Sequence, residues 1–245
     1  MAKEPGLADQ FFIDGVDLSG DVGAVDTISA RSGVLSVRGI NAAGEERILA
    51  HTDGEISFTS FFNDATSQQH LTLRDKSSGA DRIATWFHGS GIGETAAALV
   101  AKQINYDPTR GADGSLTIAT QCLGNLYGLD YCDQLTAGKR TDTGATNGTG
   151  YNNGGATALG LSAYLHVFSF TGTSVTVAVE QSSNDGGGDP YAAILTFTAA
   201  TGVTKERKVT ATLTTAVEQY LRVATTGTFN PATFAVAVCR YPYAL

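Results

Sequence analysis

The chain has 245 residues, a formal net charge of -8 and 29 glycines. Charged residues make up 16% of the chain and hydrophobic residues 42%, which excludes global disorder and favours a substantial folded core. The acidic balance excludes a protein that grips nucleic acid by neutralising its phosphates. Residues 1–135 hold 18 acidic and 9 basic side chains, and residues 136–245 hold 6 and 7. The resulting net charges of -9 and +1 indicate two modules in different surroundings.

The start of the chain, Met1 to Gln10, is polar and lacks the apolar core of a signal peptide. No run of about 18 apolar residues occurs, so we expect no membrane insertion. The cysteines are three in number and not closely spaced: Cys122, Cys132 and Cys239. We interpret them as reduced thiols, with a Cys122–Cys132 pair across a hairpin as the alternative.

The first half is predicted to consist of short strands separated by loops. Alternating or apolar runs indicate strands at 34–38, 55–61, 71–74 and 82–87, and later at 115–120 and 123–129. In the second of these strands Ile56 and Phe58 lie on one face, and polar residues lie on the other. Residues 41–46 read as a polar loop, and Asp53-Gly54 is a turn signal.

One segment departs from this strand pattern. Glu94 to Gln103 is rich in good helix formers, follows three glycines and carries an acid in its first turn. Asp107-Pro108 cannot continue a helix. We therefore predict one short helix here, lying on a β-sheet.

Residues 136–158 form the clearest change in composition, being almost wholly small, polar and Gly-rich. This predicts a flexible linker or an extended arm that is ordered against a partner. Beyond it, short evenly spaced strands return at 163–170, 173–180, 193–198, 208–213, 219–223 and 234–240. Their spacing predicts a β-sandwich, Ig-like or jelly-roll, over 159–245.

The sequence offers no catalytic constellation. The Gly89–Gly93 loop lacks the Lys-Ser/Thr of a phosphate-binding loop, and Ser90 with His88 does not satisfy the hydrolase pattern around a nucleophilic serine. We expect that the chain is not an enzyme and that it carries no cofactor. Asn184, Asp185 and Asp189 offer oxygen ligands to a cation, although the spacing is not that of an EF-hand and a plain Gly-rich turn is the favoured reading.

Several stretches resemble the major tail (tail tube) proteins of long-tailed, siphovirus-type bacteriophages. The signals occur in that family's order: Asp17 to Val22 followed by Asp26, the acidic loop 43–47, Asp53 to Phe58 with Phe61-Phe62-Asn63, the segment 94–103, and Tyr106-Asp107-Pro108. The second half resembles a β-sandwich appended to many such proteins, through 172–177, 220–223 with 225–227, and 233–238. The order and the two-part layout carry more weight than any single stretch.

The resemblance implies a mainly β fold: a tail tube β-sandwich with one short helix at 1–135, a linker or arm at 136–158, and a decoration domain at 159–245. It implies hexameric rings that stack into a tube in the virion after assembly in the host cytoplasm. The implied partners are further copies, a tape-measure protein, and tail terminator and tail-tip proteins. Genomic DNA would pass through the channel without specific binding.

Two sets of residues are expected to serve this assembly. Asp53 and Glu55 are predicted to face an acidic lumen that repels phosphates. The loop carrying Asn41, Glu45, Glu46 and Arg47 is predicted to reach between rings or neighbouring subunits. The part beyond about Thr141 is expected to be dispensable for the tube.

Two other classes of function stay open. A carbohydrate-binding or host-adhesion module would use exposed aromatics, for which Tyr151, Tyr164, Tyr191 and Tyr220 are candidates. A capsid decoration or tail terminator protein is a nearer alternative to the tail tube.

Overall fold

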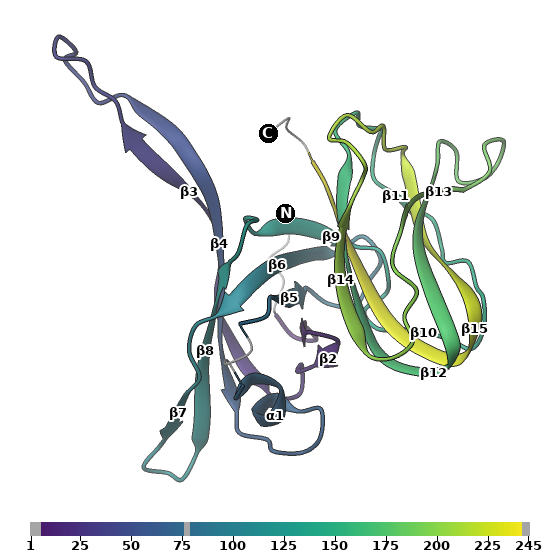
Figure 1. The fold of residues 1–245 in the computed structure, drawn as a ribbon, viewed down its shortest axis with the longest axis horizontal. Coiled ribbons are helices and arrows are strands. Elements are labelled where there is room, and N and C mark those ends of the chain that lie inside the picture. Colours follow the sequence, from purple (N-terminus) through teal and green to yellow (C-terminus); the bar gives the residue numbers. More distant parts are fainter. Residues whose placement is uncertain (1–5, 76–78, 242–245) are drawn as a thin grey trace. The chain divides into compact units, whose positions relative to one another are not determined.

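The computed structural model describes residues 6–75 and 79–241, which form two compact units (Figure 1). Unit 1 comprises Met1–Gly20, Thr85–Ala98 and Tyr131–Leu245, and unit 2 comprises Asp21–Ala84 and Leu99–Asp130. Each unit is discontinuous in the chain, whereas the sequence suggests consecutive parts at 1–135, 136–158 and 159–245. As predicted, the described residues are mainly β with one short helix.

The strands of unit 1 are β1 (Gln10–Ile13), β2 (Val16–Asp17), β9 (Asp130–Gln134), β10 (Arg140–Asp142), β11 (Tyr151–Asn152), β12 (Leu161–Ser182), β13 (Ala192–Thr196), β14 (Thr204–Val209) and β15 (Tyr220–Arg240). Unit 2 holds β3 (Val22–Ser36), β4 (Arg47–Phe61), α1 (Gln69–Leu73), β7 (Asp107–Arg110) and β8 (Leu116–Gly124). Strands β5 (Arg82–Phe87) and β6 (Thr95–Gln103) contribute residues to both units, and Asp130, the first residue of β9, belongs to unit 2.

Unit 1 is built on one long antiparallel ribbon. β12 and β15 pair from Leu161↔Arg240 to Ser182↔Tyr220, and the register shifts on both sides of Gly172. Such bulges bend a strand, and the ribbon curves strongly in Figure 1. The sequence predicts separate strands at 163–170 and 173–180, and at 219–223 and 234–240. The structure instead joins each pair of segments into one bent strand.

The core of unit 1 draws on both halves of this bent ribbon. Val167 and Val175 come from either side of the β12 bend, Val223 and Phe234 come from the two halves of β15, and all four are buried in one cluster. The members of this cluster alternate along each half of β12, although residues 161–167 are all buried. The outer strands β13 and β14 pair with opposite halves of β12.

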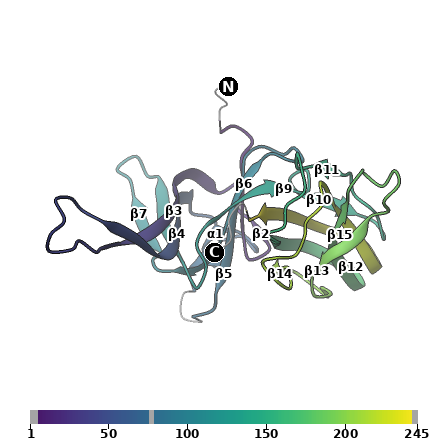
Figure 2. The same ribbon diagram turned by 90° about the horizontal axis from the view of Figure 1, so that it is seen from above.

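Unit 2 is built on an antiparallel sheet, and its longest strands form the β3–β4 hairpin. β4 pairs with β3 from Val22↔Ser60 to Ser36↔Arg47, but it pairs with β8 only from Glu55 to Phe61. The outer part of the hairpin therefore extends beyond β8 as a two-stranded ribbon, which is visible in Figures 1 and 2. The alternation predicted for 55–61 is present, because Ile56 and Phe58 are buried in the core.

The helix prediction for Glu94–Gln103 is wrong, because Thr95–Gln103 forms strand β6. Residues 96–101 are all buried, so the strand is covered on both faces and shows no polar alternation. The strand prediction at 71–74 is also wrong: Gln69–Leu73 is the helix α1. Asp53-Gly54 does not form a turn but lies within β4.

Candidate functional site

The outer end of the β3–β4 hairpin exposes apolar side chains that a single copy leaves uncovered. Val34 lies opposite Leu49, and Leu35 lies opposite Ile48. Successive residues of a strand point to opposite faces, so the two pairs occupy the two faces of the ribbon. We define the hairpin tip by its exposed apolar residues: Val34, Leu35, Val37, Ile40, Ile48 and Leu49. Their exposed fractions run from 41% for Val37 to complete exposure at Ile40.

The loop residues singled out by the sequence lie at this same end. Asn41, Glu45, Glu46 and Arg47 are all exposed. Glu45 accepts a hydrogen bond from the Ser36 hydroxyl and lies 4.0 Å from the Arg38 guanidinium. These contacts join the two sides of the loop within the same hairpin. The structure brings the four predicted residues together but does not show what they contact in an assembly.

A second exposed apolar group lies at the opposite end of β4. Phe61 and Phe62 are 55% and 40% exposed, and Leu116 at the start of β8 is 36% exposed. The Phe62 N–H donates to the Leu116 carbonyl at 3.1 Å, which joins the two segments. We call Phe61, Phe62 and Leu116 the base patch. Phe61 and Phe62 carry part of the family resemblance in the sequence, but an exposed apolar surface at these residues and Leu116 was not predicted.

The face of the β3–β4–β8 sheet that turns away from the core is polar. Arg31 lies opposite Asp53, and its guanidinium pairs with the Glu55 carboxylate at 2.6 Å. Glu55 also accepts a hydrogen bond from the Gln121 amide at 2.6 Å. Asp53 accepts the N–H of Gly54 at 2.7 Å. The two acids predicted to face a lumen thus share one sheet face, but Glu55 is buried under its partners.

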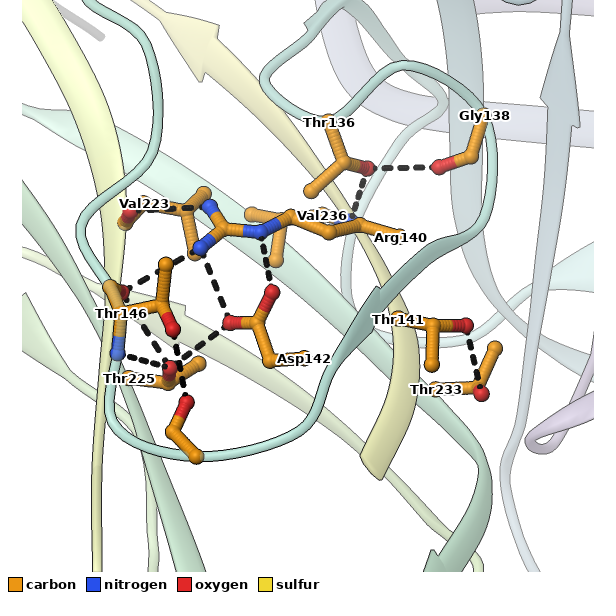
Figure 3. A network of polar contacts seen from close by, with 11 residues as sticks. Thr136, Gly138, Arg140, Thr141, Asp142, Thr146, Val223, Thr225, Thr233 and Val236 are labelled. Atoms are coloured by element: carbon orange, nitrogen blue, oxygen red, sulfur yellow. Dashed lines mark hydrogen bonds and ion pairs between the residues drawn. The ribbon is translucent and has the colours of Figure 1, made fainter. Parts of the chain in front are cut away.

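In unit 1 the Gly-rich segment predicted as a linker is fixed to β15 by side chains (Figure 3). Arg140 and Asp142 form a two-bond ion pair, with N–O distances of 2.8 and 2.9 Å. The Arg140 guanidinium also donates to the carbonyls of Val223 and Thr146. The Thr225 hydroxyl donates to Asp142 at 2.7 Å. The prediction of a flexible linker is therefore corrected, because the segment is held by its own chain.

The N-terminal β1–β2 hairpin is also fixed within unit 1. Asp14 pairs with Lys205 of β14 at 2.5 Å, and Asp17 pairs with Lys139. The ring of Phe12 packs 4.8 Å from that of Phe168, measured between centroids. Burial acts to raise the pKa of Asp17, but hydrogen bonds from Lys139 and Ser19 together outweigh it, so this pKa lies below its ordinary value. These contacts stabilise unit 1 and offer no reactive centre.

The loop proposed as a cation ligand uses its own oxygens internally. The Asn184 side-chain oxygen accepts the N–H groups of Gly188 and Asp189, and Asp189 accepts that of Ser183. Asp185 accepts the Tyr191 hydroxyl at 2.6 Å. In the part of the chain that the structure describes, no group of three or more His, Cys, Asp or Glu side chains could hold a metal ion.

The aromatic residues considered for carbohydrate binding do not form a flat exposed platform. Tyr164 is completely buried, and Tyr151 packs against the core of unit 1. The Arg222 guanidinium covers the Tyr191 ring at 4.0 Å from its centroid. Tyr220 accepts a hydrogen bond from Asn152 at 3.3 Å.

The remaining sequence-based expectations concern single side chains. Cys122, Cys132 and Cys239 are buried thiols. His88, considered beside Ser90 for catalysis, instead contacts the Asp9 carboxylate at 2.9 Å. Over residues 6–75 and 79–241, the structure contains no helix with the length and hydropathy needed to cross a membrane.

Comparisons with known proteins give structural neighbours only. No family model matches the chain, and no curated protein sequence matches it. A chain from the virion of a native gene transfer agent particle aligns with a TM-score of 0.40 and 13% identity, covering 53% of this chain and 98% of its own. The SPP1 Dit protein, a hub of the adsorption apparatus in phages infecting Gram-positive bacteria, aligns with a TM-score of 0.31 and 12% identity over 94% and 98%.

A chain of the phage p2 baseplate in its activated conformation aligns with a TM-score of 0.31 and 10% identity, over 95% of this chain and 98% of its own. The three neighbours are described as parts of a virion, of a phage adsorption apparatus and of a phage baseplate. Identities of 10–13% and TM-scores of 0.31–0.40 do not place this chain in a family.

Proposed function

We propose that this chain is a structural virion protein that polymerises as stacked rings into a phage tail tube. The observation that carries the proposal is the hairpin tip, with exposed apolar side chains on both faces of a two-stranded ribbon. An isolated two-stranded hairpin is marginally stable in water, and a contiguous exposed apolar surface marks an interaction site. A structural subunit gains stability when neighbouring copies cover such a tip.

The edge of the unit 2 sheet supports self-association as well. Among the strands that the structure describes, β3 pairs only with β4, so the outer edge of this 15-residue strand is open. A long unpaired edge is a liability in a monomer. Closing the sheets of several copies into a ring removes such edges, and six copies per ring is the number that the tail tube resemblance implies.

The polar sheet face fits the wall of a water-filled channel. It carries Asp53, Glu55 and Arg31, and Asp26 accepts a hydrogen bond from the hydroxyl of Thr59 on the same face. An acidic wall repels phosphates, so DNA slides instead of binding. In this proposal Asp53 and Glu55 face the lumen, which a tape-measure protein occupies first. Tail terminator and tail-tip proteins cap the tube, which assembles in the host cytoplasm.

Negative-stain electron microscopy of the purified protein tests this function. We expect long hollow tubes or stacked rings at high protein concentration. Single rings that never stack would favour a tail terminator or capsid decoration protein instead. A monomer that stays monomeric at millimolar concentration, measured by light scattering, would refute self-assembly.

A further inference from the structure

A hollow of about 380 Å³ in unit 1 is lined by both Gly-rich segments that the sequence singles out and that tube assembly leaves unused. It is bounded by Ile92 from the 89–93 loop, by Leu135 and Thr136, which are buried, and by residues between 137 and 149. Ligand sites in proteins typically measure about 300–1,000 Å³. The hollow therefore has room for one small molecule.

The charged side chains that line the hollow are all paired. Arg140 and Asp142 form the two-bond ion pair described above, and Lys139 is paired with Asp17. A phosphate or carboxylate ligand needs a cation that is free to pair with it, because removing a charge from water without a partner is costly. The lining therefore disfavours a charged ligand and favours a neutral polar one.

The hollow offers hydroxyl and amide groups instead. Thr141, Thr146, Asn147 and Thr149 line it and are exposed. In the part of the chain that the structure describes, no hydrogen bond engages the side chains of Asn147 and Thr149. An amide supplies two donors and an acceptor, and a hydroxyl both donates and accepts. These groups match the hydroxyls of a sugar, which donate and accept in the same way.

The backbone that carries these groups is fixed by contacts within unit 1. Asn147 is followed by Gly148, whose N–H donates to the Val223 carbonyl at 2.7 Å. Gly148 lies so close to the Arg140 guanidinium that a Cβ there would be 2.3 Å from Nη1. The same guanidinium donates to the Thr146 carbonyl on this loop (Figure 3). A site that is ordered in advance loses less entropy on binding.

We propose that this hollow binds one neutral sugar unit, the terminal residue of a glycan. Asn147 and Thr149 hydrogen-bond its hydroxyls, and Ile92 packs on the C–H groups of its ring. The volume is near the lower end of the range for ligand sites, which suits one ring, and the exposed rim leaves the rest of the glycan in solvent. The site is separate from the four tyrosines considered in the sequence, and its binding does not depend on tube assembly.

Saturation-transfer-difference NMR on the full-length protein tests the site. The probes are glucose, galactose, mannose, rhamnose and N-acetylglucosamine, each added alone in large excess over the protein. We expect magnetisation transfer from the protein to the C–H protons of at least one of these sugars. Transfer to none of them would overturn the proposal and leave the tube proposal standing.

Asn147→Ala removes the amide and should leave the fold intact, because this side chain is exposed and makes no hydrogen bond within the described residues. It should weaken binding of the responsive sugar about tenfold, which is what one or two hydrogen bonds contribute. Thr143→Ala, at an exposed position of the same loop that does not line the hollow, is the matched control and should leave the affinity unchanged. Equal affinities in the wild type and both variants would overturn the assignment.

A third variant, Ile92→Trp, fills the hollow and should abolish the transfer. A thermal melt that matches the wild type establishes that unit 1 still folds in this variant. Sugar binding that persists in the folded Ile92→Trp protein would show that the sugar binds elsewhere and overturn the proposal. Inorganic phosphate is the final probe: if it displaces the sugar at equal concentration, the hollow binds anions and the proposal is wrong.

Discussion

The backbone N–H of Gly15 donates a buried hydrogen bond to Nδ1 of His166, with 3.1 Å between the two nitrogens. On the other side of the ring, Nε2 lies 2.9 Å from the hydroxyl oxygen of Thr85. Because Nδ1 accepts, the proton of the neutral ring is on Nε2 and is donated to Thr85. The imidazole thus joins the turn between β1 and β2 to β5 and β12 in its uncharged form.

The stability of unit 1 should depend on pH through this histidine. Burial lowers the pKa of His166 from 6.5 to about 4, while Asp14 raises it and Lys205 lowers it by smaller amounts. Between these values the unfolded chain binds a proton that the folded chain does not. The stabilisation is therefore complete above pH 6.5 and is lost as the pH falls toward 4, by about 3 kcal/mol in all. Urea denaturation at pH 7 and pH 4.5, followed by fluorescence of the single tryptophan, Trp86, measures the loss.

The matched variant for this prediction is His166→Gln. It should be less stable than the wild type at pH 7 and should show a shallower loss of stability between pH 7 and pH 4.5. An equal slope in both proteins would mean that other groups carry the pH dependence.

Gly15→Ala should destabilise unit 1 by about 2 kcal/mol or more. Gly15 has a φ of +79°, and a Cβ there would lie 2.8 Å from the carbonyl oxygens of Val167 and Thr204. Gly20→Ala is the control, since a Cβ at Gly20 meets no atom within 4 Å. Thermal melts of both variants give the comparison. Equal melting temperatures would contradict a strained fit at Gly15.

Asp142→Ala should cost about 3 kcal/mol, because it leaves a largely buried guanidinium without its carboxylate. The Asp142 side chain is 4% exposed and that of Arg140 is 17% exposed. On the same short strand, Thr141 makes one exposed hydrogen bond to Thr233. Thr141→Ala should change stability by less than about 1 kcal/mol. Urea midpoints distinguish the two, and limited proteolysis should show earlier cleavage within 136–158 only for Asp142→Ala.

Asp53→Arg should convert a non-binding tube into one that retains DNA. In a ring every copy contributes the added charge, and phosphate contacts by arginine give salt-dependent binding. Asp53→Asn, which keeps an acceptor for the Gly54 N–H, is the control. Retention of short duplex DNA by tubes is measured at 50 mM and 500 mM salt. If Asp53→Arg tubes bind no more DNA than Asp53→Asn tubes, Asp53 does not face the channel.

A chain truncated after Thr141 should fail to fold unit 1. Of unit 1 it retains β1, β2, β9 and the unit 1 parts of β5 and β6, but it loses β12 and β15, which carry most of the unit 1 core. Phe12 would lose its contacts with His166 and Phe168. The sequence-based expectation that this part is dispensable for the tube is revised accordingly. Soluble truncated protein with a cooperative thermal transition would restore that expectation.

The sequence predicted strands well where one face is buried and the other is wet. Along 55–61 the alternation of Ile56 and Phe58 with polar neighbours matches the observed burial. The strand at 94–103 was not predicted, because residues 96–101 are buried on both faces and the alternation disappears. An alanine-rich apolar run is then equally compatible with a helix.

Gly54 shows a second limit of local sequence signals. Asp53-Gly54 is a favoured turn pair, yet both residues lie within β4. A Cβ at Gly54 would lie 2.6 Å from the Leu129 N and 2.7 Å from the Leu99 side chain. Glycine is needed there because another part of the chain passes close to the strand. Such a requirement comes from residues distant in sequence and is invisible in the pair itself.

The sequence predicted where the candidate site lies but not what kind of surface it presents. It singled out the loop with Asn41 and Arg47 because that loop is polar. The structure shows that the uncovered surface is apolar and comes from flanking strand residues such as Leu35 and Ile48. These residues look like ordinary strand core in the sequence. They are exposed because, in the described part of the chain, no other layer fully covers either face of this two-stranded ribbon.

The outer strand β14 has a consequence for the subunits before they assemble. It presents Lys205, Glu206, Arg207 and Lys208 in succession, and in the described part of the chain it pairs only with β12. Charged residues on an edge strand penalise the approach of a second strand. Off-pathway aggregation through this edge is therefore suppressed in a concentrated pool of newly made chains. The protein thus has an open 15-residue edge at β3 in unit 2 and an edge protected by charged residues at β14 in unit 1.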